Sequence, residues 1–495
     1  MSDTNRTQFA ITKETIFGVV PTNPVFEILR TSGQPGLGEQ KETITSGEIR
    51  ADRNVTDLIQ TNVSVSGGFE GELSFGSHDT QIEASLQGIW QNKPMRDNAL
   101  GQIVTVAATE YLVTAGSNFI AGGLYIATGF ADNANNQFFV ARALTTNTAI
   151  TANGLNAEAV PPPTAKIINV GISAGVTNIS TTVSPNKIIA PSLNFTAAGY
   201  MLSTGQWIKI GGRDLLNKFA TEANNGWARI KSVSTTELEL DIVPTGWAAD
   251  AGTGKTIYLF TGDYVRNGAA QNSFTAERQY LDHNPVTYEI LTGLTLSTMS
   301  LSLQNQSVVA ISYAYEGKKS TVSNSRAIGA TDIQPPTFDV FNTTSSVAEF
   351  KRTGQPVIAP NFVMQLDFNV NNNLRSNTAI QNLGPIRIGS GQFEVEGTLN
   401  TYFGDKSLLE DILNNVETSL NFTLKTKELE NLTTGITTAH AKAMVFDMPR
   451  IEFMSGSPNI TGPNEDVMID SAFKAVVRKD SNYTMQVQRF HFLQG

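Results

Sequence analysis

The sequence predicts an all-β protein with short flanking helices, in which one β domain occurs twice and a domain of small β modules interrupts the first copy. The composition supports this: only 16% of the residues are charged, and Thr, Ser, Asn and Gly are abundant, as in chains of many short strands joined by turns. A repeated phrase, SGGFEGELSFG at 66–76 and SGQFEVEGTLN at 390–400, supports the duplication. The unequal lengths of chain that follow the two phrases support the insertion.

The repeated phrase alternates apolar and polar residues, which is the period of two that a half-buried strand requires. Aligned on the shared letters, Phe69 matches Phe393, and the same parity holds along both strands. The alignment of the two copies continues past the strands if the turn of the second copy is three residues longer than that of the first. Each strand then leads into a helix with two apolar residues on one face. These pairs are Ile82 with Leu86 and Leu409 with Leu413.

A second pair of segments shares an irregularity. Both change the parity of their apolar residues midway, at residues 297–298 and 449–450, and Pro449 stands at the second change. A change of parity inside a strand is what a β-bulge produces, and proline is tolerated at bulges. We therefore expect an internal duplication with matching bulges in GLTLSTMSLSLQ (293–304) and AMVFDMPRIEFM (443–454).

The spacing between the repeats locates the insertion. The chain from Phe69 to Leu294 is far longer than the matching chain from Phe393 to Phe446, and the excess falls in the first half. The expected domains are the first β domain at 1–97, an insert at 98–268, the rest of the first β domain with a linker at 269–345, and the second β domain at 346–495.

The insert carries a repeat of its own. GGLYIATGF (122–130) with NNQFFVARALTTNTAIT (135–151) parallels TGQWIKIGG (204–212) with NNGWARIKSVSTTELEL (224–240). Each unit reads as a strand, an Asn-Asn turn and two further strands. Such units are too small to be stable alone, so we expect two small β modules that pack on each other.

No group of residues in the sequence indicates catalysis. The chain has no Cys, and its four His are scattered without metal-ligand spacing. AGTGKT (251–256) resembles a phosphate-binding loop, but an apolar strand pattern follows it where such a loop needs a helix. We therefore expect no catalytic residue, no metal, no cofactor and no enzyme activity.

The charge and hydropathy of the chain exclude two further classes. A net charge of −10 argues against a protein that grips nucleic acid through phosphate contacts. No run of about 18 apolar residues is present, so we expect no insertion into a membrane.

Two groups of charged residues are candidates for function. The non-core parity of the repeated strands carries Glu70, Glu72, Glu394 and Glu396. The stretch TSGEIRADRNVTDLIQTN (45–62) clusters Glu48, Arg50, Asp52, Arg53 and Asp57 in a chain otherwise poor in charge. This stretch is either an exposed loop with ion pairs of its own, worth about 0–1 kcal/mol each, or a projecting hairpin that docks on a neighbour.

The sequence resembles the siphophage major tail proteins, which are the tail tube proteins of long non-contractile tails. The resemblance in the first half rests on SGEIRADRNVTDL (46–58), GGFEGELSFG (67–76) and DTQIEASL (79–86). In the second half it rests on GSGQFEVEGTLNTYFGD (389–405) and VFDMPRIEF (445–453).

The resemblance implies a β-sandwich or half-barrel whose inner strands join neighbours in a ring, and rings that stack into a tube. Genome DNA would pass through this tube without specific binding. Strand parity alone places the four glutamates together on the non-core face, and this face either forms an acidic wall of the tube or looks outward. The charged stretch at 45–62 would then be the ring-stacking loop. A chain with two tube domains would need three copies where six domains close the ring.

The resemblance also implies a location and partners. The chain would be part of the virion tail, assembled in the host cytoplasm, with the tape measure, tail terminator and distal tail proteins as partners besides its own copies. Two other classes compete with this interpretation. One is a secreted or surface-layer bacterial adhesive protein, and the other is a carbohydrate-active enzyme.

Overall fold

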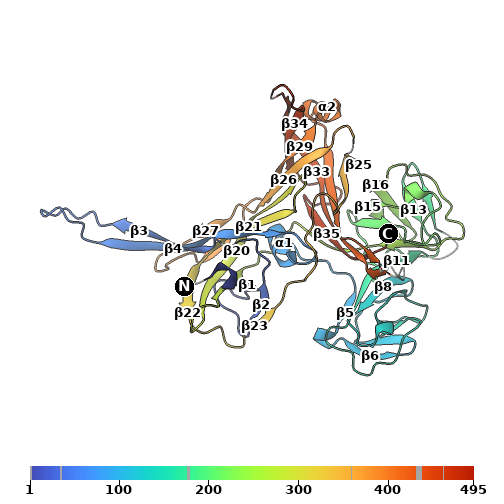
Figure 1. Cartoon of the computed structure of the whole chain (residues 1–495), viewed down its shortest axis with the longest axis horizontal. Helices are drawn as coiled ribbons and strands as arrows, with labels where there is room; N and C mark the ends of the chain where they lie inside the picture. The colour runs from blue at the N-terminus through green and yellow to red at the C-terminus, as the bar shows by residue number, and fades with distance from the viewer. Residues whose placement is uncertain are drawn as a thin grey trace.

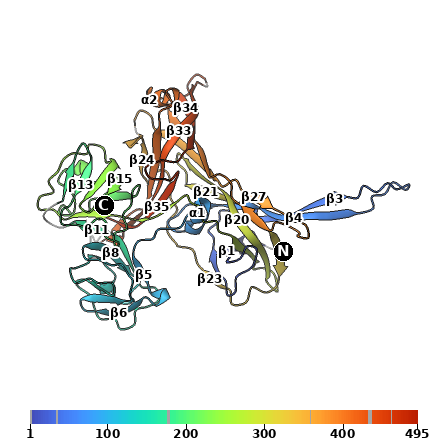
Figure 2. The same ribbon diagram turned by 180° about the vertical axis from the view of Figure 1, so that it is seen from behind.

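The computed structural model describes residues 3–33, 36–174, 179–357, 359–430, 437–460 and 462–494. Within them the chain is almost entirely β, with two short α-helices, as predicted (Figures 1 and 2). Neither helix is long and apolar enough to span a membrane. We call the parts of the molecule the first unit, the second unit and the insert.

The elements of the three parts are as follows. The first unit contains β1 (Thr7–Lys13), β2 (Val25–Ile28), β3 (Gly38–Thr45), β4 (Leu58–Glu72), α1 (Asp79–Leu86), β19 (Phe274–Tyr280), β20 (Thr287–Gln304), β21 (Ala310–Gly317), β22 (Lys319–Ser323) and β23 (Thr331–Ile333). The second unit contains β24 (Val347–Arg352), β25 (Gln355–Pro356), β26 (Val363–Asn371), β27 (Arg375–Asn377), β28 (Arg387–Gly389), β29 (Glu394–Tyr402), α2 (Ser407–Leu413), β30 (Thr418–Lys425), β31 (Leu429–Glu430), β32 (Thr437–Ala439), β33 (Ala441–Asn459), β34 (Met468–Ala475) and β35 (Gln486–Leu493). The insert contains β5 (Met95–Asp97), β6 (Ile103–Ala107), β7 (Glu110–Val113), β8 (Gly123–Thr128), β9 (Phe138–Val140), β10 (Ala149–Thr151), β11 (Lys166–Ala174), β12 (Ser180–Thr182), β13 (Lys187–Ile189), β14 (Trp207–Ile210), β15 (Trp227–Val233), β16 (Glu237–Ile242) and β17 (Ile257–Phe260), and β18 (Asp263–Arg266) follows it.

The two units have the same strand order. In the first unit neighbouring strands run β3-β4-β21-β20-β19-β1-β2. In the second unit they run β26-β29-β34-β33-β30-β24-β25. The order along the chain also matches, and each unit places its α-helix after the second strand of this series. This shared order is what the proposed internal duplication requires.

Both predicted bulges are confirmed. In β20 the register against β21 shifts between Leu296 and Thr298, and in β33 the register against β30 shifts between Met448 and Ile451. At each bulge the long strand changes its neighbouring strands. The first half of β20 lies between β19 and β22, and the second half lies between β21 and β26.

The predicted alignment of the two strands is wrong by two residues. The alignment can be checked by following the paired strands outward from each bulge. In the first unit, Phe69 of β4 pairs with Tyr313 of β21, and Tyr313 in turn pairs with β20 directly after its bulge. By the same count Val395, not Phe393, takes this place in β29. A shift of two preserves parity, so the alternation of the sequence could not reveal it.

The predicted helix pair in the second unit is also wrong. With Phe69 matched to Val395, no extra residues are needed in the second turn, and Ile82 corresponds to Leu408. Leu408 is buried, whereas Leu413 is 74% exposed. The buried face of α2 therefore lies one residue earlier than the apolar letters suggested.

The insert consists of two modules with related strand order. One places β6-β7-β10 beside β9-β8-β11, and the other runs β12-β13-β16-β15-β14-β17. The modules join through the antiparallel pair β11–β17. Their Asn-Asn turns are built alike. Asn136 Oδ1 accepts from the Phe130 N–H at 2.8 Å, and Asn225 Oδ1 accepts from the Phe219 N–H at 2.9 Å.

The insert packs against the second unit. β5 pairs with β11 inside the insert, and β18 pairs with β35 of the second unit. Phe260 of the insert packs in one apolar cluster with Val445, Phe490 and Phe492 of the second unit. The domain boundaries after residues 97 and 268 stay a prediction.

Candidate functional site

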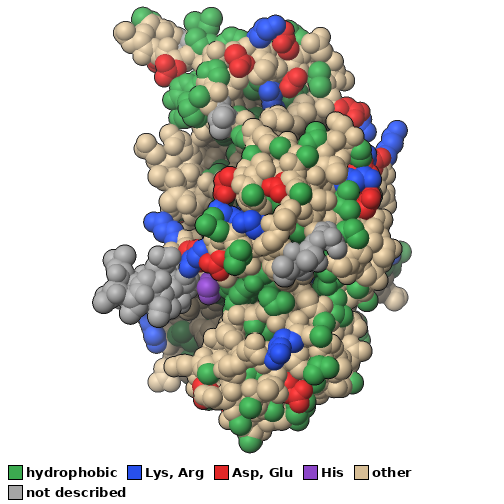
Figure 3. Space-filling view, turned by 90° about the vertical axis from the view of Figure 1, so that its right-hand side faces the viewer, with side chains coloured by type: hydrophobic (Ala, Val, Ile, Leu, Met, Phe, Trp, Pro, Cys, Tyr) green, Lys and Arg blue, Asp and Glu red, His purple; other side chains and the backbone are tan. Residues whose placement is uncertain are grey.

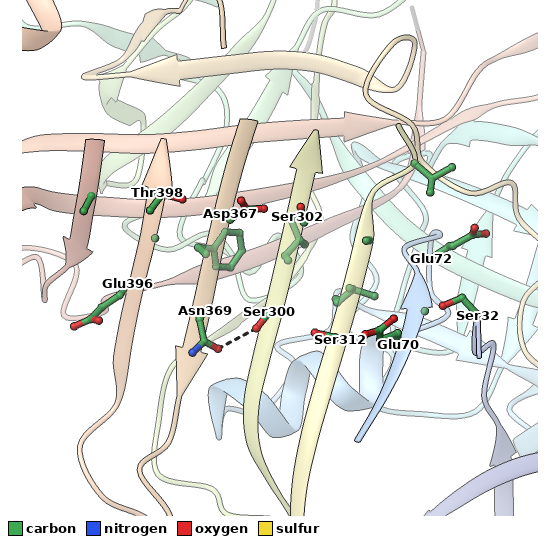
Figure 4. Close-up of a pocket in the computed structure, with 18 of the residues that line it drawn as sticks. Ser32, Glu70, Glu72, Ser300, Ser302, Ser312, Asp367, Asn369, Glu396 and Thr398 are labelled. Atoms are coloured by element: carbon green, nitrogen blue, oxygen red, sulfur yellow. Dashed lines mark hydrogen bonds between the residues drawn. The ribbon is translucent and has the colours of Figure 1, made fainter. Parts of the chain in front are cut away.

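A hollow in the large sheet crosses from the first unit to the second (Figure 4). Strands β4, β21, β20, β26, β29 and β34 lie side by side in this order, and the β20–β26 pair joins the two units. The hollow measures about 770 Å³. Its lining includes short polar side chains, among them Ser300, Ser302, Ser312, Asn369 and Thr398, together with acidic and apolar residues.

The opposite face of the same strands is the main core. Phe69, Met299, Val370 and Leu399 alternate with the hollow-lining residues and are at most 4% exposed. One side of the sheet is therefore packed and the other is open to solvent, as is usual for an antiparallel sheet.

The structure brings the predicted glutamates to the hollow side. Glu70 and Glu72 on β4 and Glu396 on β29 line it directly (Figure 4). Glu394 lies two residues before Glu396 on the same strand face. Sequence reasoning missed a further acid on this face, Asp367 of β26, which lines the hollow between them.

Sequence reasoning also missed a cation on this face. Lys474 of β34 bridges two of the glutamates, with Nζ 2.9 Å from Glu394 Oε1 and 2.8 Å from Glu396 Oε1. This contact lowers the pKa of Glu394 and raises that of Lys474. The register of β29 against β34, which places Lys474 opposite Glu396, could not be read from the sequence.

The sheet that carries the hollow ends differently on its two sides. At one end the segment before β3 lies along β4, where the Ser32 N–H donates to Glu70 O at 3.0 Å. At the other end the second half of β33 pairs with β34 on one side, and no described strand pairs with its other edge. Ser32 and Met454 mark these two ends of the hollow.

A family model for phage tail tube proteins matches residues 4–475. The chain belongs to the phage tail tube protein family. It is a structural protein of the virion tail. A search among curated proteins found no match.

The charged stretch of this tail tube protein forms the tip of a projecting arm. The arm is the β3–β4 hairpin, which extends away from the rest of the chain (Figures 1 and 2). Glu48, Arg50, Asp52, Arg53 and Asp57 lie at its tip, and all five are exposed.

Two of the charged residues at the tip form an ion pair with each other. Arg50 Nη2 lies 2.8 Å from Asp52 Oδ2, and a hydrogen bond from Arg50, with others from Asn54, lowers the pKa of Asp52 to about 2. The sequence reading overlooked the apolar residues of the arm. Ile49 is 98% exposed and Val55 is 71% exposed.

The insert presents an outer face of mixed character. Figure 3 shows this side of the tail tube protein, with acidic and basic side chains scattered among polar ones and small apolar groups. The AGTGKT stretch is followed by strand β17, as predicted, and not by a helix.

The histidines of the tail tube protein have structural surroundings. Burial lowers the pKa of His78 to about 4, and its Nε2 lies 3.2 Å from Glu72 O. His491 Nε2 lies 2.7 Å from Asp263 Oδ2. Within the described part of the chain, no three His, Cys, Asp or Glu residues are grouped so that they could hold a metal ion.

Proposed function

We propose that three copies of this chain close into a ring, and that rings stack into the tube through which the genome of a siphovirus is ejected. The observation that carries the proposal is the β20–β26 pair. It joins the first unit to the second through seven residue pairs, from Thr298 opposite Asn371 to Gln304 opposite Gln365.

The same joint explains how a ring closes. The unpaired edge of β33 corresponds by strand order to the edge of β20 that β26 occupies. The place that β26 and β27 take in the second unit is taken in the first unit by the residues just before β3, followed by β3 itself. A second chain that brings this segment to β33 repeats the internal joint between chains. Open strand edges otherwise pair with other chains in an uncontrolled way. When the same rotation relates each copy to the next and the ring closes, every such edge pairs with the edge of a neighbour.

The hollow supports an assignment of the channel wall. If each joint repeats the geometry within the chain, the polar faces form one continuous inner surface. Serine, asparagine and threonine side chains offer DNA no cation there, and Lys474 is already paired with Glu394 and Glu396. Glu70, Glu72, Glu394 and Glu396 repel the phosphates of DNA. DNA then passes without specific binding, and a tape measure protein occupies the channel before ejection.

The ends of the tube supply the other partners. Tail terminator and distal tail proteins cap the stacked rings, and assembly takes place in the host cytoplasm. No catalytic step is required of the chain, because its task is to provide a rigid, smooth conduit.

Electron microscopy of the purified chain tests the proposal. We expect tubes whose cross-section shows six similar lobes from three chains, because each chain supplies two units. Symmetry analysis of the tube, together with the mass of isolated rings, measures the number of chains. Six chains per ring, or particles that never form rings, would contradict it.

A further inference from the structure

The two units differ at the place beside their bulges. In the first unit this place is filled by the second unit. The Asn372 N–H donates to Ser297 O at 2.9 Å, and Asn372 Nδ2 donates to Ser85 O at 3.0 Å. Next to it, Gln87 Nε2 donates to Ser390 Oγ at 2.7 Å.

These contacts fasten a hairpin. Strands β27 and β28 form a short hairpin that continues β26 and β29 beyond the sheet. Its base therefore rests on the end of α1 and on the bulge of β20. Further out, the Gln271 side chain donates to Ile388 O at 2.8 Å.

In the second unit the corresponding place is open. A cleft of about 500 Å³ lies beside the bulge of β33, lined by Pro449 and Arg450 of the second unit and on its insert side by Arg229 and Asp241. Apolar side chains stand exposed around the end of α2 and the edge of β33: Leu413 is 74% exposed, Val416 39% and Met454 55%. Exposed apolar side chains at a free strand edge and a helix end are available for contact with a partner.

The hairpin that corresponds to β27–β28 in the first unit is the β3–β4 arm. Each hairpin extends the same two positions of the strand order, but the arm is much longer and projects from the chain (Figure 1). It too exposes apolar side chains, with Ile44 60%, Leu58 63% and Ile59 49% exposed. Within the chain, the β27–β28 hairpin of the second unit contacts the end of α1 and the bulge of β20. The corresponding hairpin of the first unit, the arm, and the corresponding surface of the second unit have no such contact with each other within the chain.

We propose that the β3–β4 arm of one copy docks sideways on the second unit of the neighbouring copy, against the end of α2 and the bulge of β33. This inference rests on the proposed ring and names the partner surface of its joint. The partner is a second copy of this chain. Among the described residues, the β3–β4 arm is the counterpart of the β27–β28 hairpin, and it projects away from its own chain. The arm then forms a lateral clasp, meaning a contact between neighbouring copies of the same ring. From the sequence alone we expected the charged stretch at 45–62 to contact the next ring instead.

Charge is compatible with this docking. The cleft is lined by groups of both signs, including Glu417, Arg450 and Asp480. The arm tip also carries both signs, but it lies farther out along the hairpin than Ser64 and is not the part that reaches this cleft. Any contact that the arm makes with the exposed charges of the cleft should weaken with salt, while the apolar contact should not.

The correspondence between the units selects residues for a test. The match of Phe69 to Val395 makes Ser64 correspond to Ser390, and Leu413 to Gln87. The chain has no Cys, so introduced pairs are the only thiols. The test variant is Ser64→Cys with Leu413→Cys, and the matched internal control is Gln87→Cys with Ser390→Cys.

Tubes of each variant are assembled under reducing conditions, confirmed by electron microscopy, oxidised, and separated on a denaturing gel. We expect the test variant to give linked species that stop at the trimer, and the control to give only internally linked monomer. A second control pairs Ser64→Cys with Leu144→Cys, which is 80% exposed on the insert, and should not link.

The outcomes separate the inference from the proposed function. Linked species that continue beyond the trimer would show axial docking and overturn the lateral clasp. Intact tubes with no linkage, in conditions where the control pair links, would also overturn it and leave the tube function standing. Failure of the wild-type chain to form any ring would contradict the proposed function itself.

Discussion

At the scale of single residues, the connection between the insert and the second unit depends on a buried charge network. Arg229 of β15 is 2% exposed, and its guanidinium lies 2.9 Å from both Asp447 Oδ1 and Asp241 Oδ2. The Tyr483 hydroxyl donates to Asp447 Oδ2 at 2.8 Å. Burial raises the pKa of Asp447 although Arg229 opposes the shift.

Replacing Arg229 by Met should therefore leave a buried carboxylate without its main counter-charge. We expect a loss of about 3–5 kcal/mol in the free energy of unfolding, measured with denaturant on the unassembled chain. Because the pKa of Asp447 is raised in the folded state, its ionisation opposes folding. The deficit should therefore grow as the pH rises above the ordinary carboxyl pKa of about 4 and shrink below it.

The double variant Arg229→Met with Asp447→Asn serves as the control. It removes the stranded charge, so it should be more stable than the single variant at neutral pH and should lose most of the pH dependence. A single variant as stable as the wild type would mean that the network does not hold the insert in place.

At the scale of elements, what the sequence could predict depends on how local the signal is. The bulges in β20 and β33 were predictable because each changes the parity of apolar residues within one strand. The correspondence of Phe69 with Val395 was not predictable, because any even shift preserves parity and only partner strands fix the register.

Strand β35 shows a second limit. Gln486 and Gln488 alternate with apolar residues and suggest a solvated face, yet both are fully buried. Gln488 Nε2 donates to Trp207 O at 2.8 Å, and its Oε1 accepts from the Trp207 N–H at 2.8 Å. Only the insert, far away in sequence, supplies these partners. The hollow followed the same pattern, since the Glu residues were placed on it by parity but Lys474 required the register.

The first unit suggests how the insert can be removed. Strand β22 pairs with the first half of β20 as β35 pairs with the first half of β33. Among the described residues no domain like the insert covers β22, which is mostly exposed. Its sequence is KSTVS, whereas β35 reads QVQRFHFL. A simple deletion should therefore expose Phe490 and Phe492 and cause aggregation.

We predict that a Gly/Ser link in place of residues 98–260, with Val445, Phe490 and Phe492 changed to Thr, gives a soluble chain that still forms tubes. This deletion keeps β18, which pairs with β35. Light scattering measures aggregation, and electron microscopy measures the tubes, which should be narrower. The same deletion without the three substitutions is the control. A soluble substituted chain that cannot form rings would place the insert in the ring contact.

At the scale of the whole molecule, the decisive quantity is the charge that the hollow presents to DNA. Glu70 and Glu72 are the best residues to change, because within the described chain neither forms an ion pair, whereas Glu394 and Glu396 share Lys474. Their side chains are exposed, so substitution should leave the core behind β4 intact.

Changing Glu70 and Glu72 to Lys should slow genome ejection while leaving tubes intact. If the hollow lines the channel, DNA passes within about one Debye length of the wall, roughly 8 Å at physiological salt. Cations placed there would attract phosphates through counterion release, and this friction should fall steeply as salt is raised. Ejection is measured on particles carrying the variant, with a DNA-binding dye that reports release over time.

The matched variant with Gln at both positions removes the charge without reversing it, so it should eject at close to the wild-type rate. Equal ejection by the Lys variant and the wild type at low salt would remove the polar face of β4 from the channel wall. A Gln variant as slow as the Lys variant would attribute the delay to altered packing of the sheet, because only reversal of charge creates the attraction.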